Sequence, residues 1–259
     1  LNATSASNGP ASSTIVNTTI NITAVNDAPI VTAGASLAYT ENDAARIIDN
    51  TIAISDLDDT NIAGATVTIA SVVTGDTLGF VNQNGITGSY NSSSGVLTLT
   101  GTTTKANYET ALRSVTYYST SQDPIVITTR PTRTWAVTDA NSDAVGAQTS
   151  IGVTSSVSIT GVNDVPVADL NGASTGVDNS VTWTEVADAA NTAVTIMANA
   201  TLSDVDNSKA TQLLLVVSGM SDSNNDVLSI SGTSFGLATS VTNQVVGSFK
   251  ISYIASTRT

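Results

Sequence analysis

The sequence predicts an all-β protein made of tandem antiparallel β-sandwiches joined end to end, with at most one short helix per unit. Three observations support this prediction. The chain is rich in Thr, Ser, Asn, Ala and Val, and only 11% of it is charged, a composition that favours strands over charged helices. Short alternating segments follow one another between turn residues. The segment ITAVNDAPIV at 22–31 returns as ITGVNDVPVA at 159–168, which is typical of repeated domains.

Each of the two matching segments is predicted to end a half-buried strand. Ile20 and Ile22 alternate with polar neighbours in the first copy, and Val157 and Ile159 do so in the second. Proline has no backbone N–H to donate to a strand ladder, so each strand is expected to stop at the Asn-Asp-x-Pro motif. The motif therefore marks a boundary between units.

Two further pairs of segments extend the repeat. AYTEN at 38–42 matches TWTEV at 182–186, and ISDLDD at 54–59 matches LSDVDN at 202–207. The second copy carries extra residues around 169–178. We therefore predict three parts, which are the closing strand of a preceding repeat at 1–25, one complete sandwich at 26–162, and a second sandwich, incomplete at its C-terminal end, at 163–259.

Short strands are predicted inside the complete unit, and they are separated by turn residues. The strand segments lie within 64–73, 95–101, 112–119 and 132–139, and loops are expected at 82–85 and 90–95. One helix is predicted over 103–113, with Thr103 or Thr104 as its N-cap. Trp135 and Trp183 lie on alternating strands and are expected to anchor the two cores rather than to stack on sugars.

The net charge and the absence of Cys and His argue against several classes of function. Eight Lys and Arg against 21 Asp and Glu give a net charge of −13, which repels nucleic acid and anionic membranes and attracts cations. Without Cys or His, the chain has neither thiolate ligands nor the commonest general base, and we expect no enzyme. Oxygen ligands remain, and these are the ligands of calcium. Such a composition is typical of soluble extracellular bacterial proteins.

Acidic and amide side chains gather where neighbouring sandwiches are predicted to meet. Massed carboxylates repel one another, and a divalent cation removes that repulsion; calcium accepts mixed Asp, Asn and Glu ligands in flexible geometry. There are plainer alternatives for each segment. Asn-Asp-x-Pro could be a plain turn, DLDD at 56–59 a solvated loop, and DANSD at 139–143 an ordinary hairpin turn. The candidate metal ligands are Asn26, Asp27, Glu41, Asp56, Asp58, Asp59 and Asp139 in the first copy, and Asn163, Asp164, Glu185, Asp204 and Asp206 in the second.

The order of a Glu-Asn segment, an Asp-x-Asp segment and a boundary Asn-Asp-x-Pro resembles cadherin repeats. Together with LTLTGTTTKANYETALRSVTYYS and RTWAVTDAN, it is similar to the bacterial cadherin-like modules of large secreted RTX-type adhesins. This resemblance implies immunoglobulin-like sandwiches in series, stiffened by Ca²⁺ at the linkers. It implies that Asn26 and Asp27 are linker ligands, that Asp56 and Asp58 come from the following domain, and that Glu41 reaches one end of its own domain. The same arrangement would recur with Asn163, Asp164, Asp204 and Asp206.

The expected function is that of a calcium-rigidified extender module of a large extracellular adhesin or matrix protein, which supports cell adhesion. Its expected partners are the neighbouring repeats of the same chain, and other copies in an assembly or a cell-surface glycan or protein are further candidates. We expect it neither to bind nucleic acid nor to insert into a membrane. Two alternatives remain open. The chain could build a surface layer or filament, or bind a glycan through the loops at 82–94 or 169–178.

Overall fold

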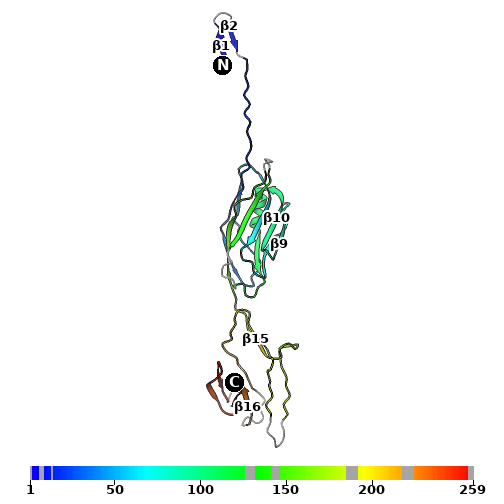
Figure 1. The fold of residues 1–259 in the computed structure, drawn as a ribbon, viewed down its shortest axis with the longest axis vertical. Helices are drawn as coiled ribbons and strands as arrows, with labels where there is room; N and C mark the ends of the chain where they lie inside the picture. The colour runs from blue at the N-terminus through cyan, green and yellow to red at the C-terminus, as the bar shows by residue number, and fades with distance from the viewer. Residues whose placement is uncertain are drawn as a thin grey trace. The chain divides into compact units, whose positions relative to one another are not determined.

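The computed structural model describes residues 2–5, 9–12, 14–125, 132–141, 146–184, 192–217 and 225–255. The chain divides into two compact units, Leu1–Asp164 and Val165–Thr259, which are described separately below. Within the described residues, the regular structure is strand apart from one short helix (Figure 1). The prediction of an all-β chain of the β-sandwich class is thereby confirmed.

One layer of the first unit is a six-stranded sheet in the order β4-β13-β12-β7-β10-β9. Four of its five strand pairs are antiparallel, and β9 and β10 can be seen side by side in Figure 1. The pair β4–β13 is parallel, which departs from the predicted antiparallel arrangement. No tight turn joins these two strands, so nothing forces them to run in opposite directions. The strands are β4 (Ser36–Thr40), β7 (Asn61–Ile69), β9 (Thr87–Asn91), β10 (Val96–Thr104), β12 (Thr132–Asp139) and β13 (Val153–Thr160).

The opposite layer is built from two smaller sheets, β5-β11-β8 and β3-β6. Side chains from both layers form one buried core, in which the rings of Tyr39 and Tyr117 meet edge to face at 5.0 Å. Trp135 of β12 is fully buried there, as predicted. The strands of this layer are β3 (Ile30–Thr32), β5 (Arg46–Ile47), β6 (Ala53–Ser55), β8 (Asp76–Gly79) and β11 (Thr116–Ser119).

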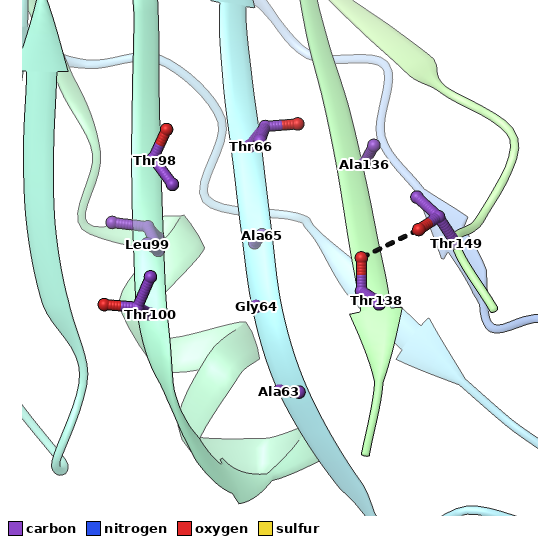
Figure 2. A pocket seen from close by; sticks show the side chains of 10 residues that line it. All are labelled: Ala63, Gly64, Ala65, Thr66, Thr98, Leu99, Thr100, Ala136, Thr138 and Thr149. Carbon is purple, nitrogen blue, oxygen red and sulfur yellow. Dashed lines mark hydrogen bonds between the residues drawn. The ribbon is translucent and has the colours of Figure 1, made fainter. Parts of the chain in front are cut away.

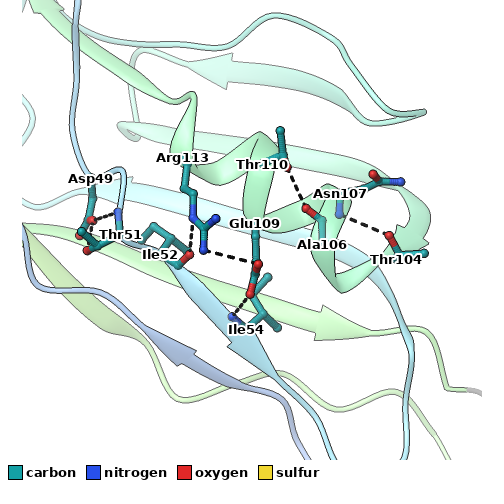
Figure 3. A network of polar contacts seen from close by, with 10 residues as sticks. All are labelled: Asp49, Thr51, Ile52, Ile54, Thr104, Ala106, Asn107, Glu109, Thr110 and Arg113. Carbon is teal, nitrogen blue, oxygen red and sulfur yellow. Dashed lines mark hydrogen bonds and ion pairs between the residues drawn. The ribbon is translucent and has the colours of Figure 1, made fainter.

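The predicted helix forms as α1 (Lys105–Arg113), and Thr104 is its N-cap. Its side chains complete the edge of β6, as Figure 3 shows. The backbone N–H of Ile54 donates to Glu109 Oε1 at 2.8 Å, and Arg113 Nε donates to the carbonyl of Ile52 at 2.7 Å. The helix thus satisfies backbone groups that a further strand would otherwise have paired with.

A buried carboxylate, Asp49, links the two layers. It accepts hydrogen bonds from the backbone of Gly34 and Ala35 before β4, from Thr51, and from the hydroxyl of Ser155 on β13. Ser155 in turn accepts the indole N–H of Trp135 at 2.9 Å. Such a satisfied polar network fixes the positions of the strands that share it.

The strand predicted before the first Asn-Asp-x-Pro motif does not form in this chain, and the assignment of residues 1–25 to a preceding repeat stays a prediction. The chain forms a hairpin of β1 (Asn2–Ser5) and β2 (Gly9–Ser12), and residues 14–29 hold no strand. Ile20 and Ile22 are 78% and 88% exposed. The equivalent strand β13 pairs with β12 and β4, and no described strand pairs with residues 14–25. An alternating pattern does not make a strand without a neighbour to pair with.

The second unit contains three two-stranded antiparallel sheets among its described residues. The first of them repeats a pairing of the first unit, because Val167 is opposite Ser203 as Ile30 is opposite Ser55. The strands are β14 (Val167–Asp169), β15 (Thr201–Ser203), β16 (Val227–Ile230), β17 (Thr233–Gly236), β18 (Val241–Val246) and β19 (Phe249–Tyr253).

Trp183 does not anchor a core in the second unit, which corrects the prediction for this residue. Its side chain is 51% exposed and lies outside any strand, whereas Tyr39 at the matching position of the first unit is buried. Tyr39 belongs to β4, which enters its sheet through β13 alone. The described part of the second unit contains no counterpart of β13, so the segment around Trp183 has no strand to pair with.

Replacing Asp49 is expected to destabilise the first unit. Asp49→Asn puts an amide N–H₂ among groups that donate, and we expect a loss of about 2–3 kcal/mol in the free energy of unfolding, measured by urea denaturation. Asp43→Asn is the matched control, because Asp43 makes an exposed ion pair with Arg46 at 3.7 Å and should cost no more than about 0.5 kcal/mol. Equal losses for the two variants would contradict the role of Asp49.

The contribution of Asp49 should also depend on pH. Burial raises its pKa, but the hydrogen bonds it accepts outweigh burial and hold the pKa well below its usual range. Because the folded-state pKa is depressed, this stability is fully present above the unfolded pKa of about 3.9 and is lost as the pH falls below it. The difference in stability between the wild type and Asp49→Asn should therefore shrink as the pH falls from about 4 towards the depressed folded-state pKa, and a constant difference over that range would be the contrary result.

Candidate metal centre

Three carboxylates meet in the loop between β6 and β7. Asp56 Oδ1 accepts the backbone N–H groups of Asp58 and Asp59 at 3.2 and 2.8 Å, which closes the loop into a turn. The turn places one carboxylate oxygen of each of the three residues within 4.8 Å of the others. The loop thus concentrates negative charge at one end of the sandwich.

The segment that enters the domain is tied to the same end. The backbone N–H of Asp27 donates to Asp58 Oδ2 at 2.8 Å. The side chain of Asn26 is buried, and its N–H₂ donates to Asp139 Oδ2 at 2.9 Å and to the carbonyl of Gly146 at 3.0 Å. Four predicted ligands, Asn26, Asp27, Asp58 and Asp139, are therefore linked by two hydrogen bonds at the domain entrance.

Asp139 has a structural task at this end. It lies at the end of β12, is fully buried, and accepts hydrogen bonds from Asn26, the N–H of Asn141 and the N–H of Gln148. It fastens the entering segment to the loop that follows β12. Its further role as a metal ligand stays a prediction.

Lys105 supports the acidic loop from the helix. Its Nζ donates to the carbonyl oxygens of Asp56 and Asp59 at 2.8 and 2.6 Å. Sequence reasoning did not assign Lys105 to the site. A signal existed, because a cation in the first turn of a helix opposes the helix dipole and so needs another reason to be there.

The carboxylates of Asp56 and Asp58 perturb each other. Burial raises the pKa of Asp56, and the neighbouring carboxylate of Asp58 raises it further. The backbone N–H of Asp27 lowers the pKa of Asp58. The raised pKa of Asp56 means that its ionised form is less stable than that of an ordinary exposed carboxyl group, a penalty that a divalent cation would reduce.

The donor atoms at this end fit calcium. Among the described residues, Asn26 Oδ1, Asp56 Oδ2 and Asp58 Oδ1 are buried oxygens without a hydrogen-bond partner. Buried polar atoms rarely lack a partner, so an unsatisfied group of them needs an explanation. All are hard oxygen donors, the type that calcium takes in sets of six to eight.

Glu41 lies at the opposite end of the sandwich from Asp139. It follows β4, which runs parallel to β13, and its N–H donates to the carbonyl of Thr160 at 2.8 Å. Its Oε2 accepts the N–H of Val162 at 2.8 Å, and its Oε1 is buried without a hydrogen bond from any described residue. Glu41 is therefore fastened beside the chain that leads into Asn163 and Asp164.

The second unit repeats the acidic turn. Asp204 Oδ1 accepts the N–H groups of Asp206 and Asn207 at 3.0 and 2.8 Å, as Asp56 does for its neighbours. Glu185 lies outside the described residues. Asn163 and Asp164 belong to the first unit and Asp204 and Asp206 to the second, so the second metal site stays a prediction.

Comparison with known proteins gives one partial match. No protein-family model matches the chain. Part of the chain is 37% identical over 106 residues to halomucin of Haloquadratum walsbyi, and the match covers 38% of this chain and 1% of halomucin. The similarity is thus to a short stretch of a far longer protein. Among the described residues, no helix is long and apolar enough to cross a membrane.

Removing the lysine should loosen the acidic loop. Lys105→Met keeps the aliphatic stem but leaves the two loop carbonyls without their donor, and we expect faster hydrogen exchange at the amides of Asp58 and Asp59 and a loss of about 1–2 kcal/mol in stability. Lys209→Met in the second unit is the control with the same charge change. Unchanged exchange at Asp58 and Asp59 would show that Lys105 does not hold the loop.

Proposed function

We propose that this chain is a structural module of a large extracellular surface or matrix protein, in which calcium at the domain ends stiffens a series of β-sandwiches and so supports cell adhesion. The observation that carries the proposal is the group of Asp56, Asp58 and Asp59, to which the entering segment is bound through the N–H of Asp27. A cation held there would join the linker to the following domain.

Different residues of this chain would have different roles at the proposed calcium site between the linker and the domain. Asp56, Asp58 and Asp59 supply carboxylate oxygens, and Asn26 supplies its unpaired amide oxygen. Asp139 orients Asn26, and Lys105 supports the loop carbonyls. A bound calcium ion would neutralise the carboxylates. Without that neutralisation their mutual repulsion favours a looser linker, and extracellular modules of this kind bind calcium at about 10⁻⁴–10⁻³ M, above cytosolic levels.

A second set of ligands is proposed at the end of the domain where the chain leaves it. Glu41 holds the backbone at Val162 while one of its oxygens is free among the described residues. We infer that this oxygen serves the next joint together with Asn163 and Asp164. The acidic turn at Asp204 has the local geometry of the turn at Asp56 and would supply the following domain's ligands.

The similarity to halomucin supports a place in a very long chain, because a module that resembles 1% of a protein is one of many parts. The acidic composition, rich in oxygen donors, suits the binding of calcium at extracellular concentrations. The absence of His and Cys from the sequence argues against general-base and thiolate catalysis. Of the segment 82–94 named in the glycan-binding alternative, residues 87–91 form the edge strand β9, and turns lie on both sides of this strand.

Calcium should stabilise the first unit. At about 2 mM calcium and a dissociation constant of about 10⁻⁴ M, each bound ion adds about 2 kcal/mol by mass action. We expect the melting temperature to rise by roughly 5–10 °C relative to EDTA. Asp58→Asn should remove most of this rise, and Asp226→Asn in the second unit, which makes the same charge change, should keep it. A rise that survives Asp58→Asn would place the ion elsewhere, and no rise would exclude the proposal.

A further inference from the structure

The outer side of the six-stranded sheet is lined by hydroxyl groups. We call this surface the hydroxyl face. Strand register places its side chains in three rows across the sheet. Hydroxyls of adjacent strands bond to each other, at 3.0 Å between Thr87 and Thr100 and at 2.8 Å between Thr138 and Thr149. The rows are Thr87-Thr100-Gly64-Thr138-Thr149, Ser89-Thr98-Thr66-Ala136 and Asn91-Val96-Thr68-Thr134-Thr154.

A shallow depression lies in the middle of the hydroxyl face. Gly64 and Ala136 are neighbours in adjacent rows, and their small size leaves a hollow of about 430 Å³ between raised threonines. Figure 2 shows the hollow with Thr66, Thr98 and Thr100 on one side. The face therefore offers both projecting threonines and a recess large enough to admit a threonine side chain.

The hydroxyl face carries no charge in its described rows, although the chain has a net charge of −13. Acidic residues of the described first unit lie away from this face, as Asp56 and Glu41 at the two ends and Glu109 on α1 illustrate. Surface charge normally keeps acidic chains apart. This face is thus where two copies can approach without like-charge repulsion.

We propose that the hydroxyl face docks against the hydroxyl face of a second copy of this chain. A hydroxyl both donates and accepts, so a face made of threonine and serine is complementary to itself, as a two-fold contact requires. The threonine methyl groups add apolar area, and the hollow at Gly64 and Ala136 receives a raised threonine of the partner. Sheets with small side chains pack face to face in this way.

The size of the face makes each contact weak. Five strands about 4.8 Å apart and six residues of about 3.4 Å give roughly 500 Å² on each copy, or about 1,000 Å² in total. Stable interfaces bury about 1,200 Å² or more, so a single pair of modules should associate only transiently. In a chain of many repeats, the contacts add by avidity and hold two chains side by side. This inference goes beyond the proposed calcium joint and does not depend on it.

The chain has no cysteine, so single cysteines can report the contact. We would oxidise Thr98→Cys, at the centre of the face, and Thr110→Cys, on the exposed side of α1, in the full chain at the same concentration. Docking predicts that the disulfide-linked dimer forms about tenfold faster with Thr98→Cys, because docking brings both thiols into one small contact and raises their effective concentration. Equal rates would overturn the proposal.

A second substitution tests whether docking requires the hydroxyl face to be uncharged. Thr66→Lys in the Thr98→Cys chain places a cation in each facing surface, and it should reduce the rate of dimer formation to that of Thr110→Cys. A nearby lysine lowers the pKa of a thiol and would by itself speed oxidation, so the expected decrease has no chemical origin other than lost docking. An unchanged rate, with an unchanged melting temperature, would refute docking. Soluble oligosaccharide that abolishes the Thr98→Cys advantage would assign the face to carbohydrate instead and would also refute it.

Discussion

The repulsion among carboxylates at the entrance of the first domain is the constraint on which the rest of the molecule depends. Asp56, Asp58 and Asp59 are held within 4.8 Å of one another by the turn at Asp56. Lys105 of α1 supports the loop by donating to the carbonyls of Asp56 and Asp59. The backbone N–H of Asp27 donates to the carboxylate of Asp58. Gathering like charges and leaving oxygens unsatisfied costs the isolated domain stability, and the proposed calcium ion would relieve that cost.

The positions of the acidic residues also explain why the hydroxyl face of the large sheet carries no charge in its described rows. The core is formed by alternating apolar residues, and the network of Asp49, Ser155 and Trp135 helps to join its layers. With the acids at the ends, the large sheet is free to carry threonine and serine. In the proposed function the ends connect modules along the chain, and in the proposed docking the side meets a second chain. The two proposed contacts are chemically independent of each other.

Much of this was predictable from local pattern. The helix over 103–113 and the strand at 132–139 follow from capping and alternation, and they form nearly where expected. The failures share a cause, which is that a strand needs a partner. Residues 15–25 and the segment of Trp183 have the right alternation but no described neighbouring strand, and both are exposed. Lys105 was missed because its task is set by a loop some fifty residues earlier, a distance that periodicity does not report.

The most direct test of the account is a calcium titration of the ¹⁵N-labelled chain followed by amide NMR. The account predicts saturable shifts at the amides of Asp27, Asp58 and Asp59, with a midpoint of about 10⁻⁴–10⁻³ M, while amides of the β9–β10 hairpin stay unchanged. Those three amides donate to the carboxylates that would hold the ion, so they must respond if it binds there. Their constancy through about 10 mM calcium, ten times the upper end of that range, would contradict the central claim.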